Sequence, residues 1–291
     1  MSAAPAGAVP ALLAGLCDDA AVFPPGSLPL EQAVAAHVGH TTAAYGELVG
    51  SFVLEAAELG RLATLTAGLP AGSFALSLTV PLPDVAAALS AAARTPAVRL
   101  VALEVRIPEG TPAAEVVPRL TAGIGDRTVS VFVEVPRDGR RDPLLAALGA
   151  TGLMAKFRTG GVRADLYPDE AELAAAILAA VRAGVPFKAT AGLHHALRNT
   201  DPRAGFEQHG FLNVLAATGA AVDGARPAGI AEVLADRDGA RVAARVRALH
   251  VRTRAVFRSF GTCSIAEPAT ELARLGLLSP AVVADLTEVP T

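Results

Sequence analysis

The sequence has 291 residues, of which 52% are hydrophobic, and a formal net charge of −3 at pH 7. This is ample apolar material for a core, and the 25 Lys and Arg residues do not outnumber the 28 Asp and Glu residues, so a nucleic-acid partner is not expected. No apolar run reaches the length of a bilayer span, and residues 1–16 lack the basic start of a signal peptide, so no membrane partner is expected either. Two cysteines, Cys17 and Cys263, provide no disulfide framework, which favours a reducing, cytoplasmic location.

Short apolar runs alternate with segments of helical pattern along the chain. Strands are predicted, in order, at residues 17–25, 51–56, 74–80, 99–107 and 128–135, at the runs that contain Lys156 and Lys188, and at 257–265. Helices are predicted between them at residues 30–38, 58–66, 83–94, 112–122, 142–148 and 169–184, within a long segment at 205–256, and finally at 268–275.

Eight strands separated by helices predict an α/β fold of the (β/α)8 TIM-barrel type. We expect one domain over residues 1–291, with a flexible N-terminal tail at 1–10 and a helix-rich insertion before the last strand. The rival is an open, doubly wound sheet, which is disfavoured because no Gly-x-Gly-x-x-Gly motif follows an early strand. Apolar outer helices would also permit a homo-oligomer.

Polar side chains gather near the ends of the predicted strands. Because side chains alternate along a strand, each of the four central strands has one purely apolar face and one face that carries polar groups. Barrel active sites lie at the C-terminal ends of the strands. We therefore expect a ring of inward-facing residues at one mouth of the barrel, namely Glu55, Thr79, Glu104, Glu134, Lys156, Lys188 and Ser264.

Two lysines at the ends of neighbouring parallel strands need an explanation, because lysine is costly to bury. Repulsion between the two ammonium groups, together with desolvation, is expected to lower a lysine pKa. A neutral amine attacks carbonyl compounds and forms a Schiff base, for which Glu104 or Glu134 would move the protons. This set of groups predicts a class I aldolase that needs no cofactor. A purely structural layer of ion pairs is the alternative.

The same segment resembles the deoxyribose-phosphate aldolase family. That family has a Lys-Thr-x-Thr-Gly motif on its sixth strand and a Lys-x-x-Gly-Gly motif on its seventh, and this chain reads Lys-Phe-Arg-Thr-Gly from Lys156 and Lys-Ala-Thr-Ala-Gly from Lys188. Phe-Gly-Thr-Cys-Ser at 260–264 stands where the family's last strand helps to hold a phosphate, and Glu104 stands where the family has a catalytic Asp. The resemblance implies that Lys156 forms the Schiff base, that Lys188 lowers its pKa and that Glu104 relays protons.

The departures from this pattern concern the substrate. Phe157 and Arg158 replace Thr and a small residue, and Leu193 follows Gly192 where the family has further phosphate-binding backbone. We therefore expect related chemistry on a different small carbonyl compound, phosphorylated or not, with Arg158 holding any anionic end. The residues expected to bind substrate are Arg158, Thr159, Gly160, Thr190, Gly192, His194, Asn213, Gly261 and Ser264.

The predicted function is thus a lyase that acts through a lysine Schiff base. One alternative is a metal-dependent hydrolase that uses His194, His195 and His209 with nearby acids, although no His-x-His or His-Glu-x-x-His spacing occurs and no metal ligand is assigned. The other is a non-catalytic barrel that binds a small anion. Asp18 and Asp19 are open between substrate binding and turn capping.

Overall fold

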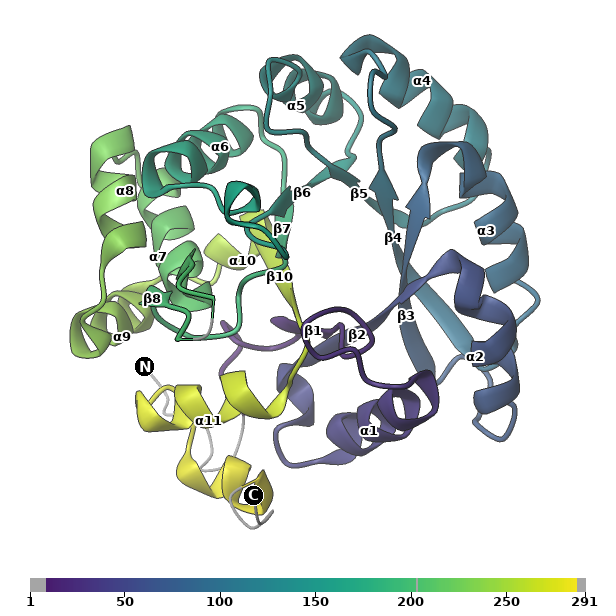
Figure 1. The fold of residues 1–291 in the computed structure, drawn as a ribbon, viewed down its shortest axis with the longest axis horizontal. Coiled ribbons are helices and arrows are strands. Elements are labelled where there is room, and N and C mark those ends of the chain that lie inside the picture. Colours follow the sequence, from purple (N-terminus) through teal and green to yellow (C-terminus); the bar gives the residue numbers. More distant parts are fainter. Residues whose placement is uncertain (1–8, 203, 287–291) are drawn as a thin grey trace.

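The computed structural model describes residues 9–202 and 204–286, and within them eight parallel strands close into a barrel surrounded by helices (Figure 1). The predicted TIM-barrel fold is therefore confirmed. Around the barrel the strands follow the order β1 (Cys17–Asp19), β2 (Val49–Glu55), β3 (Phe74–Pro81), β4 (Val98–Arg106), β5 (Ser130–Glu134), β6 (Met154–Arg158), β7 (Phe187–Thr190) and β10 (Phe257–Thr262), which pairs again with β1.

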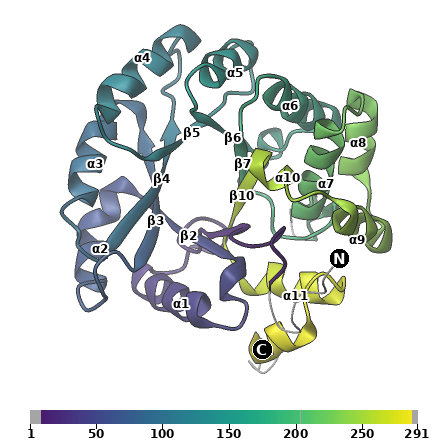
Figure 2. The ribbon, with the colours of Figure 1, turned by 180° about the vertical axis from the view of Figure 1, so that it is seen from behind.

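Helices cover the outside of the barrel between consecutive strands, as the views from both sides show (Figures 1 and 2). The first six are α1 (Leu30–Thr42), α2 (Leu59–Leu65), α3 (Val85–Ala92), α4 (Ala113–Ile124), α5 (Arg141–Gly149) and α6 (Glu170–Arg182). The last, α11 (Ala266–Arg274), follows β10. No helix in the described part of the chain combines the length and the apolar character that crossing a membrane requires.

The predicted helix-rich insertion lies between β7 and β10. It contains α7 (Phe211–Val222), α8 (Pro227–Ala235), α9 (Gly239–Ala248) and α10 (Thr253–Val256). Nearly every residue of α7 is buried, because this helix occupies the seventh position against the barrel and α8 lies outside it (Figure 1). A two-stranded antiparallel hairpin, β8 (Asn199–Thr200) with β9 (Glu207–Gln208), precedes α7, and the sequence pattern does not predict it.

Two terminal elements differ from the sequence expectations. The strand expected at 17–25 ends at Asp19, because the chain then turns, with Phe23 N donating to Ala20 O at 2.9 Å, and Pro24 and Pro25 have no N–H to give a sheet. The last strand ends at Thr262 instead of 265. Residues 1–8 of the expected N-terminal tail lie outside the described residues, and Val9 is buried.

Side-chain alternation places the charged residues inside the barrel. On β4, Leu103 and Val105 face the helices and are fully buried, while Glu104 faces inward between them. In the strand register, Lys156 of β6 lies opposite Lys188 of β7 on one side and opposite Glu134 of β5 on the other. The strand pairing thus brings these charged groups to one level of the barrel interior.

Candidate active site

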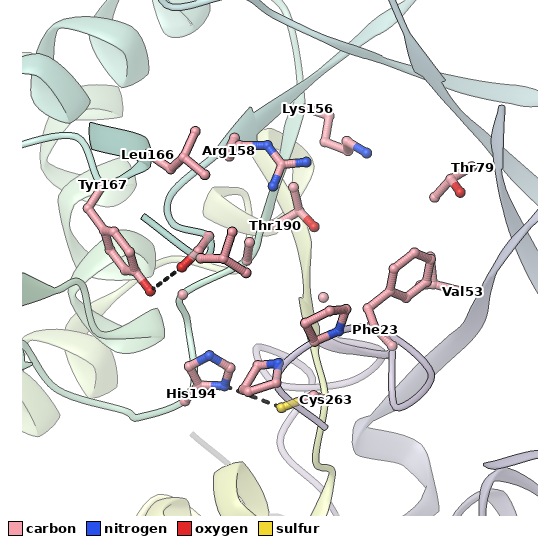
Figure 3. A pocket seen from close by; sticks show the side chains of 18 of the residues that line it. Phe23, Val53, Thr79, Lys156, Arg158, Leu166, Tyr167, Thr190, His194 and Cys263 are labelled. Carbon is pink, nitrogen blue, oxygen red and sulfur yellow. Dashed lines mark hydrogen bonds between the residues drawn. The ribbon is translucent and has the colours of Figure 1, made fainter. Parts of the chain in front are cut away.

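A cavity of about 550 Å³ opens at the C-terminal ends of the barrel strands (Figure 3). Its floor consists of inward-facing strand residues, and its upper wall consists of loop residues that follow β1, β6 and β7. A volume of this size is typical of sites for small molecules, and this mouth is where barrel enzymes carry their catalytic groups. The strand residues that line the cavity are Val53, Glu55, Thr79, Glu104, Arg106, Glu134, Lys156, Arg158, Lys188, Thr190 and Gly261.

Lys156 and Lys188 are the only lysines in the sequence, and both line this cavity. The remaining 23 of the 25 Lys and Arg residues are arginines. The two lysines are also almost completely buried, with 3% and 1% of their surface exposed. Both lysines thus lie where a positive charge is costly to bury.

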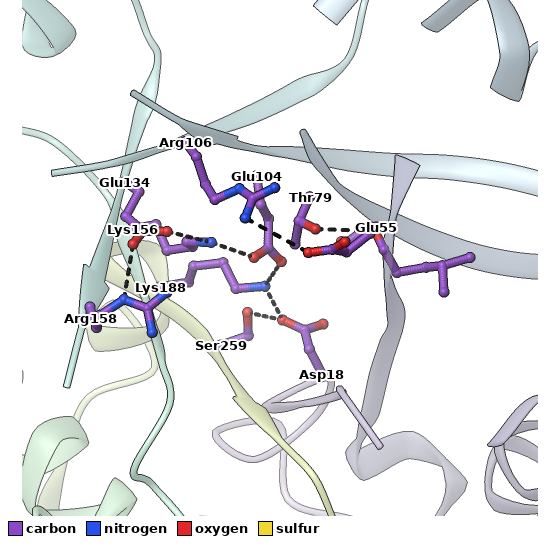
Figure 4. Close-up of polar contacts among 12 residues, drawn as sticks. Asp18, Glu55, Thr79, Glu104, Arg106, Glu134, Lys156, Arg158, Lys188 and Ser259 are labelled. Carbon is purple, nitrogen blue, oxygen red and sulfur yellow. Dashed lines mark hydrogen bonds and ion pairs between the residues drawn. The ribbon is translucent and has the colours of Figure 1, made fainter. Parts of the chain in front are cut away.

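Lys188 is held as an ammonium group by two carboxylates (Figure 4). Its Nζ donates hydrogen bonds to Asp18 Oδ2, at 2.7 Å, and to Glu104 Oε1. Asp18 is fixed in turn, because its Oδ1 accepts from the backbone N and the Oγ of Ser51, both at 2.9 Å, and its Oδ2 accepts from Ser259 Oγ. Burial alone would lower the pKa of Lys188, but the negative charges of Asp18 and Glu104 outweigh burial and raise it above the usual value.

Lys156 lies between Glu104 and Glu134. Its Nζ donates to Glu104 Oε2 at 3.2 Å and forms an ion pair with Glu134 Oε2 at 3.0 Å that lacks hydrogen-bond geometry. No described donor makes a hydrogen bond to this buried Oε2 atom of Glu134, while its Oε1 accepts from Arg158 Nε at 3.0 Å. Glu134 therefore presents one buried carboxylate oxygen, beside the Lys156 amine, that can accept a further proton.

The charges on the two lysines keep both glutamates ionised. Burial would raise the pKa of Glu104, but Lys188 and Lys156 outweigh burial and lower it to about 2. Burial would also raise the pKa of Glu134, but the positive charges of Lys156 and Arg158 outweigh burial and lower it. The sequence expectation that repulsion and burial lower a lysine pKa is wrong for Lys188, because Asp18 and Glu104 compensate its charge.

Five of the nine residues predicted to bind substrate line the cavity, namely Arg158, Thr190, Gly192, His194 and Gly261. Thr159 lies beneath it, where its Oγ1 donates to Ala191 O at 2.6 Å. Gly160 packs on Gly192 so closely that an added Cβ would lie 2.7 Å from the Gly192 Cα, so both glycines allow the loops after β6 and β7 to touch.

Two residues predicted to bind substrate lie elsewhere. Asn213 is fully buried in α7, where its Oδ1 accepts from Arg198 N and its Nδ2 donates to Val233 O and Asp236 O. Ser264 is not part of the cavity wall, although its neighbour Cys263 is, and Ser264 Oγ accepts from Glu267 N at the start of α11. Both predictions are corrected to structural roles.

The histidines of the metal-site alternative are dispersed. His195 pairs with Glu271 at 2.7 Å, and His209 is buried with its Nε2 against Pro168 O at 2.8 Å. His194 alone lines the cavity, and its Nδ1 lies 3.4 Å from Cys263 Sγ. Among residues 9–202 and 204–286, no group of three or more His, Cys, Asp or Glu side chains could hold a metal ion.

The sequence analysis did not identify Asp18 and Ser259 as partners of Lys188. Asp18 was open between two roles, and Asp19 accepts from Ala21 N and pairs with His37 at 3.0 Å instead of reaching the cavity. The position of Asp18 on the first strand was a signal for this contact. In a closed barrel the first strand pairs with the last strand, here β10, and β10 pairs with β7, which carries Lys188. For Lys156 and Lys188, the stronger signal was that the sequence contains no other lysine.

Comparison with models of known protein families gives no match, and neither does comparison with curated proteins. The resemblance to deoxyribose-phosphate aldolases thus rests on the short motifs that begin at Lys156 and Lys188. The chemistry of the site has to be derived from the charged groups on the cavity floor.

Proposed function

We propose that this protein is a class I aldolase-like enzyme, a carbon–carbon or carbon–oxygen lyase that acts on a small carbonyl compound through a Schiff base on Lys156. The observation that carries the proposal is the use of lysine at positions 156 and 188 alone, both at the floor of the cavity. Arginine keeps its proton in proteins and cannot form a Schiff base, so chemistry that needs a nucleophilic amine requires lysine at such a position.

Lys156 is the better nucleophile of the two lysines. Lys188 is kept protonated by Asp18 and Glu104, which raise its pKa. Lys156 lies beside a carboxylate oxygen of Glu134 that has no hydrogen-bond donor among the described residues. Transfer of a proton from Lys156 Nζ to Glu134 would leave a neutral amine facing the cavity.

The subsequent steps need only proton transfers among groups already present. The Lys156 lone pair forms a bond to the carbonyl carbon, the C=O π electrons move to oxygen, and a proton passes from the Lys156 nitrogen to that oxygen to give a neutral carbinolamine. Glu134 then gives back the proton that it took from Lys156, the hydroxyl leaves as water, and an iminium ion forms. The iminium accepts the electron pair of a neighbouring carbon–carbon or carbon–hydrogen bond, and Glu134 or Glu104, both carboxylates at this stage, accepts the proton that is released. Lys188, which remains a cation, keeps Glu104 ionised between these steps.

Reductive trapping tests the proposal directly. Incubation with borohydride and a panel of small aldehydes and ketones should add one reduced adduct, and peptide mapping should place it on Lys156. The background is small because Lys188 and the N-terminus are the only other amines of this kind in the chain. Lys156→Arg, which preserves the positive charge, should lose the adduct, and the matched Lys188→Arg variant should retain it.

Two outcomes contradict parts of the proposal. A label on Lys188 that persists in Lys156→Arg would reverse the roles of the lysines. If no carbonyl compound labels either lysine of the unmodified protein, the Schiff-base function is wrong and the lysines form a structural ion-pair layer.

The proposal also extends to a cytoplasmic location, because both cysteines are free thiols.

A further inference from the structure

Apolar side chains form much of the upper cavity wall, which also contains His194, Asp201, Gln208 and Cys263. Five of these apolar side chains lie on loops above the charged floor, and we call them the apolar collar: Phe23, Val162, Leu166, Tyr167 and Phe206 (Figure 3 labels all but Val162 and Phe206). They come from the loop after β1, the loop after β6 and the β8–β9 hairpin. The one polar atom of these side chains, Tyr167 Oη, donates to Gly161 O at 2.9 Å, and the Tyr167 and Phe206 rings lie 5.4 Å apart. The collar thus offers apolar surface to whatever enters.

Val162 is the part of the collar that most needs a partner. Its side chain is 75% exposed, and among the described residues only Val251 is another large apolar residue with comparable exposure. Val251 lies far from the cavity wall in the connection before α10, whereas Val162 belongs to the wall itself. An exposed apolar residue on the wall of a small-molecule cavity is what a bound apolar group would cover.

The charges that line the cavity are already balanced. Four described lining residues are cationic and four are anionic, and the cations Lys156, Lys188, Arg158 and Arg106 each pair with a carboxylate, the last with Glu55 at 3.7 Å. Burial lowers the pKa of His194, so this residue adds no positive charge at pH 7. A phosphate or carboxylate of the substrate would therefore compete with carboxylates that these cations already face, although at Arg158 only Nε contacts Glu134.

We propose that the substrate is a carbonyl compound whose remaining part is an uncharged apolar group, alkyl or aromatic, that fills the collar. The inference rests on the proposed Schiff-base function, because that function places the carbonyl carbon at Lys156 and so directs the rest of the molecule upward. The collar then determines specificity: it desolvates an apolar tail favourably, whereas an anionic tail within the collar would lose water to apolar side chains.

Three aldehydes that differ only beyond the reacting end test this inference. Propanal, 3-phenylpropanal and succinic semialdehyde share the group –CH2–CH2–CHO and end in hydrogen, phenyl and carboxylate. The half-saturating concentration for reductive trapping on Lys156 should be at least about tenfold lower for 3-phenylpropanal than for propanal, because a buried phenyl ring contributes that much binding. Succinic semialdehyde and glyceraldehyde 3-phosphate should be no better than propanal.

Val162→Asp provides the matched variant, with Val251→Asp as its control. Position 162 is mostly exposed, so the substitution leaves the fold intact, but it replaces apolar surface of the collar by a charge. We expect Val162→Asp to lose most of the preference for 3-phenylpropanal over propanal. Val251→Asp should keep this preference.

The outcomes separate this inference from the function on which it rests. Tighter trapping of succinic semialdehyde or glyceraldehyde 3-phosphate, or equal trapping of all the aldehydes, would overturn the apolar-substrate inference and leave the Schiff base in place. The unreactive alcohol 3-phenylpropan-1-ol tests the collar without chemistry: it should raise the Tm of the unmodified protein and of Lys156→Arg, but not of Val162→Asp. If that pattern is found while no aldehyde labels Lys156, the collar stands and the Schiff-base function fails.

Discussion

Glu104 connects the two lysines, and its charge is the central electrostatic feature of the site. Oε1 accepts from Lys188 and Oε2 accepts from Lys156, so one carboxylate is shared by two buried cations, which Asp18 and Glu134 also help to compensate. Replacing either lysine by a neutral residue would remove one of the two cations that keep Glu104 ionised. The residue that we propose to assist proton transfer therefore also contributes to stability.

The depressed pKa of Glu104 predicts a pH dependence of stability. Its pKa is about 2 in the fold and 4.5 ordinarily, so its stabilising contribution is complete above pH 4.5 and is lost as the pH falls towards 2. From pH 6 to pH 3 this group should account for a loss of about 2 kcal/mol in the free energy of unfolding. Urea denaturation at both pH values should show a smaller loss in Glu104→Gln. Equal losses in the two proteins would mean that Glu104 is not held ionised by the lysines.

At the scale of elements, His209 forms a hydrogen bond to one of the loops that carry the apolar collar. This residue lies just before α7, and its Nε2 donates to the carbonyl of Pro168, just before α6. Pro168 directly follows Tyr167, so the hydrogen bond holds the end of the β6–α6 loop, which includes the collar residues Leu166 and Tyr167. Burial lowers the pKa of His209 to about 4, so His209 is neutral in the folded protein near pH 7.

Acidification should weaken this connection. Because the pKa of His209 is about 4 in the fold and 6.5 ordinarily, its contribution is complete above pH 6.5 and is lost as the pH falls through that range to 4. The expected loss is about 2 kcal/mol between pH 7 and pH 5. His209→Gln keeps an N–H donor for Pro168 O but does not titrate, so its unfolding free energy should change less over this interval. A comparison at pH 8, where neither side chain is charged, isolates the cost of the substitution itself.

At the scale of the whole molecule, the barrel could be predicted because its strands repeat one pattern. On β4 and β5 one face is apolar, with Val101, Leu103 and Val105 or Val131 and Val133, while the other face carries a glutamate near its C-terminal end, and this pattern indicates strand and face without reference to any distant segment. The same alternation predicted that Lys156 and Lys188 face the interior at one mouth of the barrel. Boundaries were least accurate where the pattern is short, as at β1, which has three residues and then reaches the two prolines.

The rest of the site depends on contacts that local patterns do not contain. Asp18 is 170 residues from Lys188, and only closure of the barrel through β10 brings them together. The collar contains Phe206 from a hairpin whose strands are two residues long, too short for any periodic signal. Asn213 was assigned to the cavity because a polar residue early in a helix has the same sequence appearance whether it binds a ligand or, as here, neighbouring backbone.

The Asp18–Lys188 ion pair joins the two ends of the fold, and its coupling can be measured. β1 is only three residues long, so it adds few ladder hydrogen bonds to the closure, while Asp18 reaches past β10 to β7 and also accepts from Ser259 of β10. Removing one partner of a buried pair leaves an uncompensated charge, so Asp18→Asn and Lys188→Met should each reduce the free energy of unfolding by about 3 kcal/mol.

The double variant should be less destabilised than the sum of the single variants, because neither charge is then left alone at this contact, and we expect a coupling energy of about 1–3 kcal/mol from urea denaturation. The exposed pair of Glu31 and Arg61 provides the control cycle, since its charges are solvated and should show little coupling. Additive effects of Asp18→Asn and Lys188→Met would show that the two substitutions destabilise the barrel independently, and that the ion pair does not contribute to closing it.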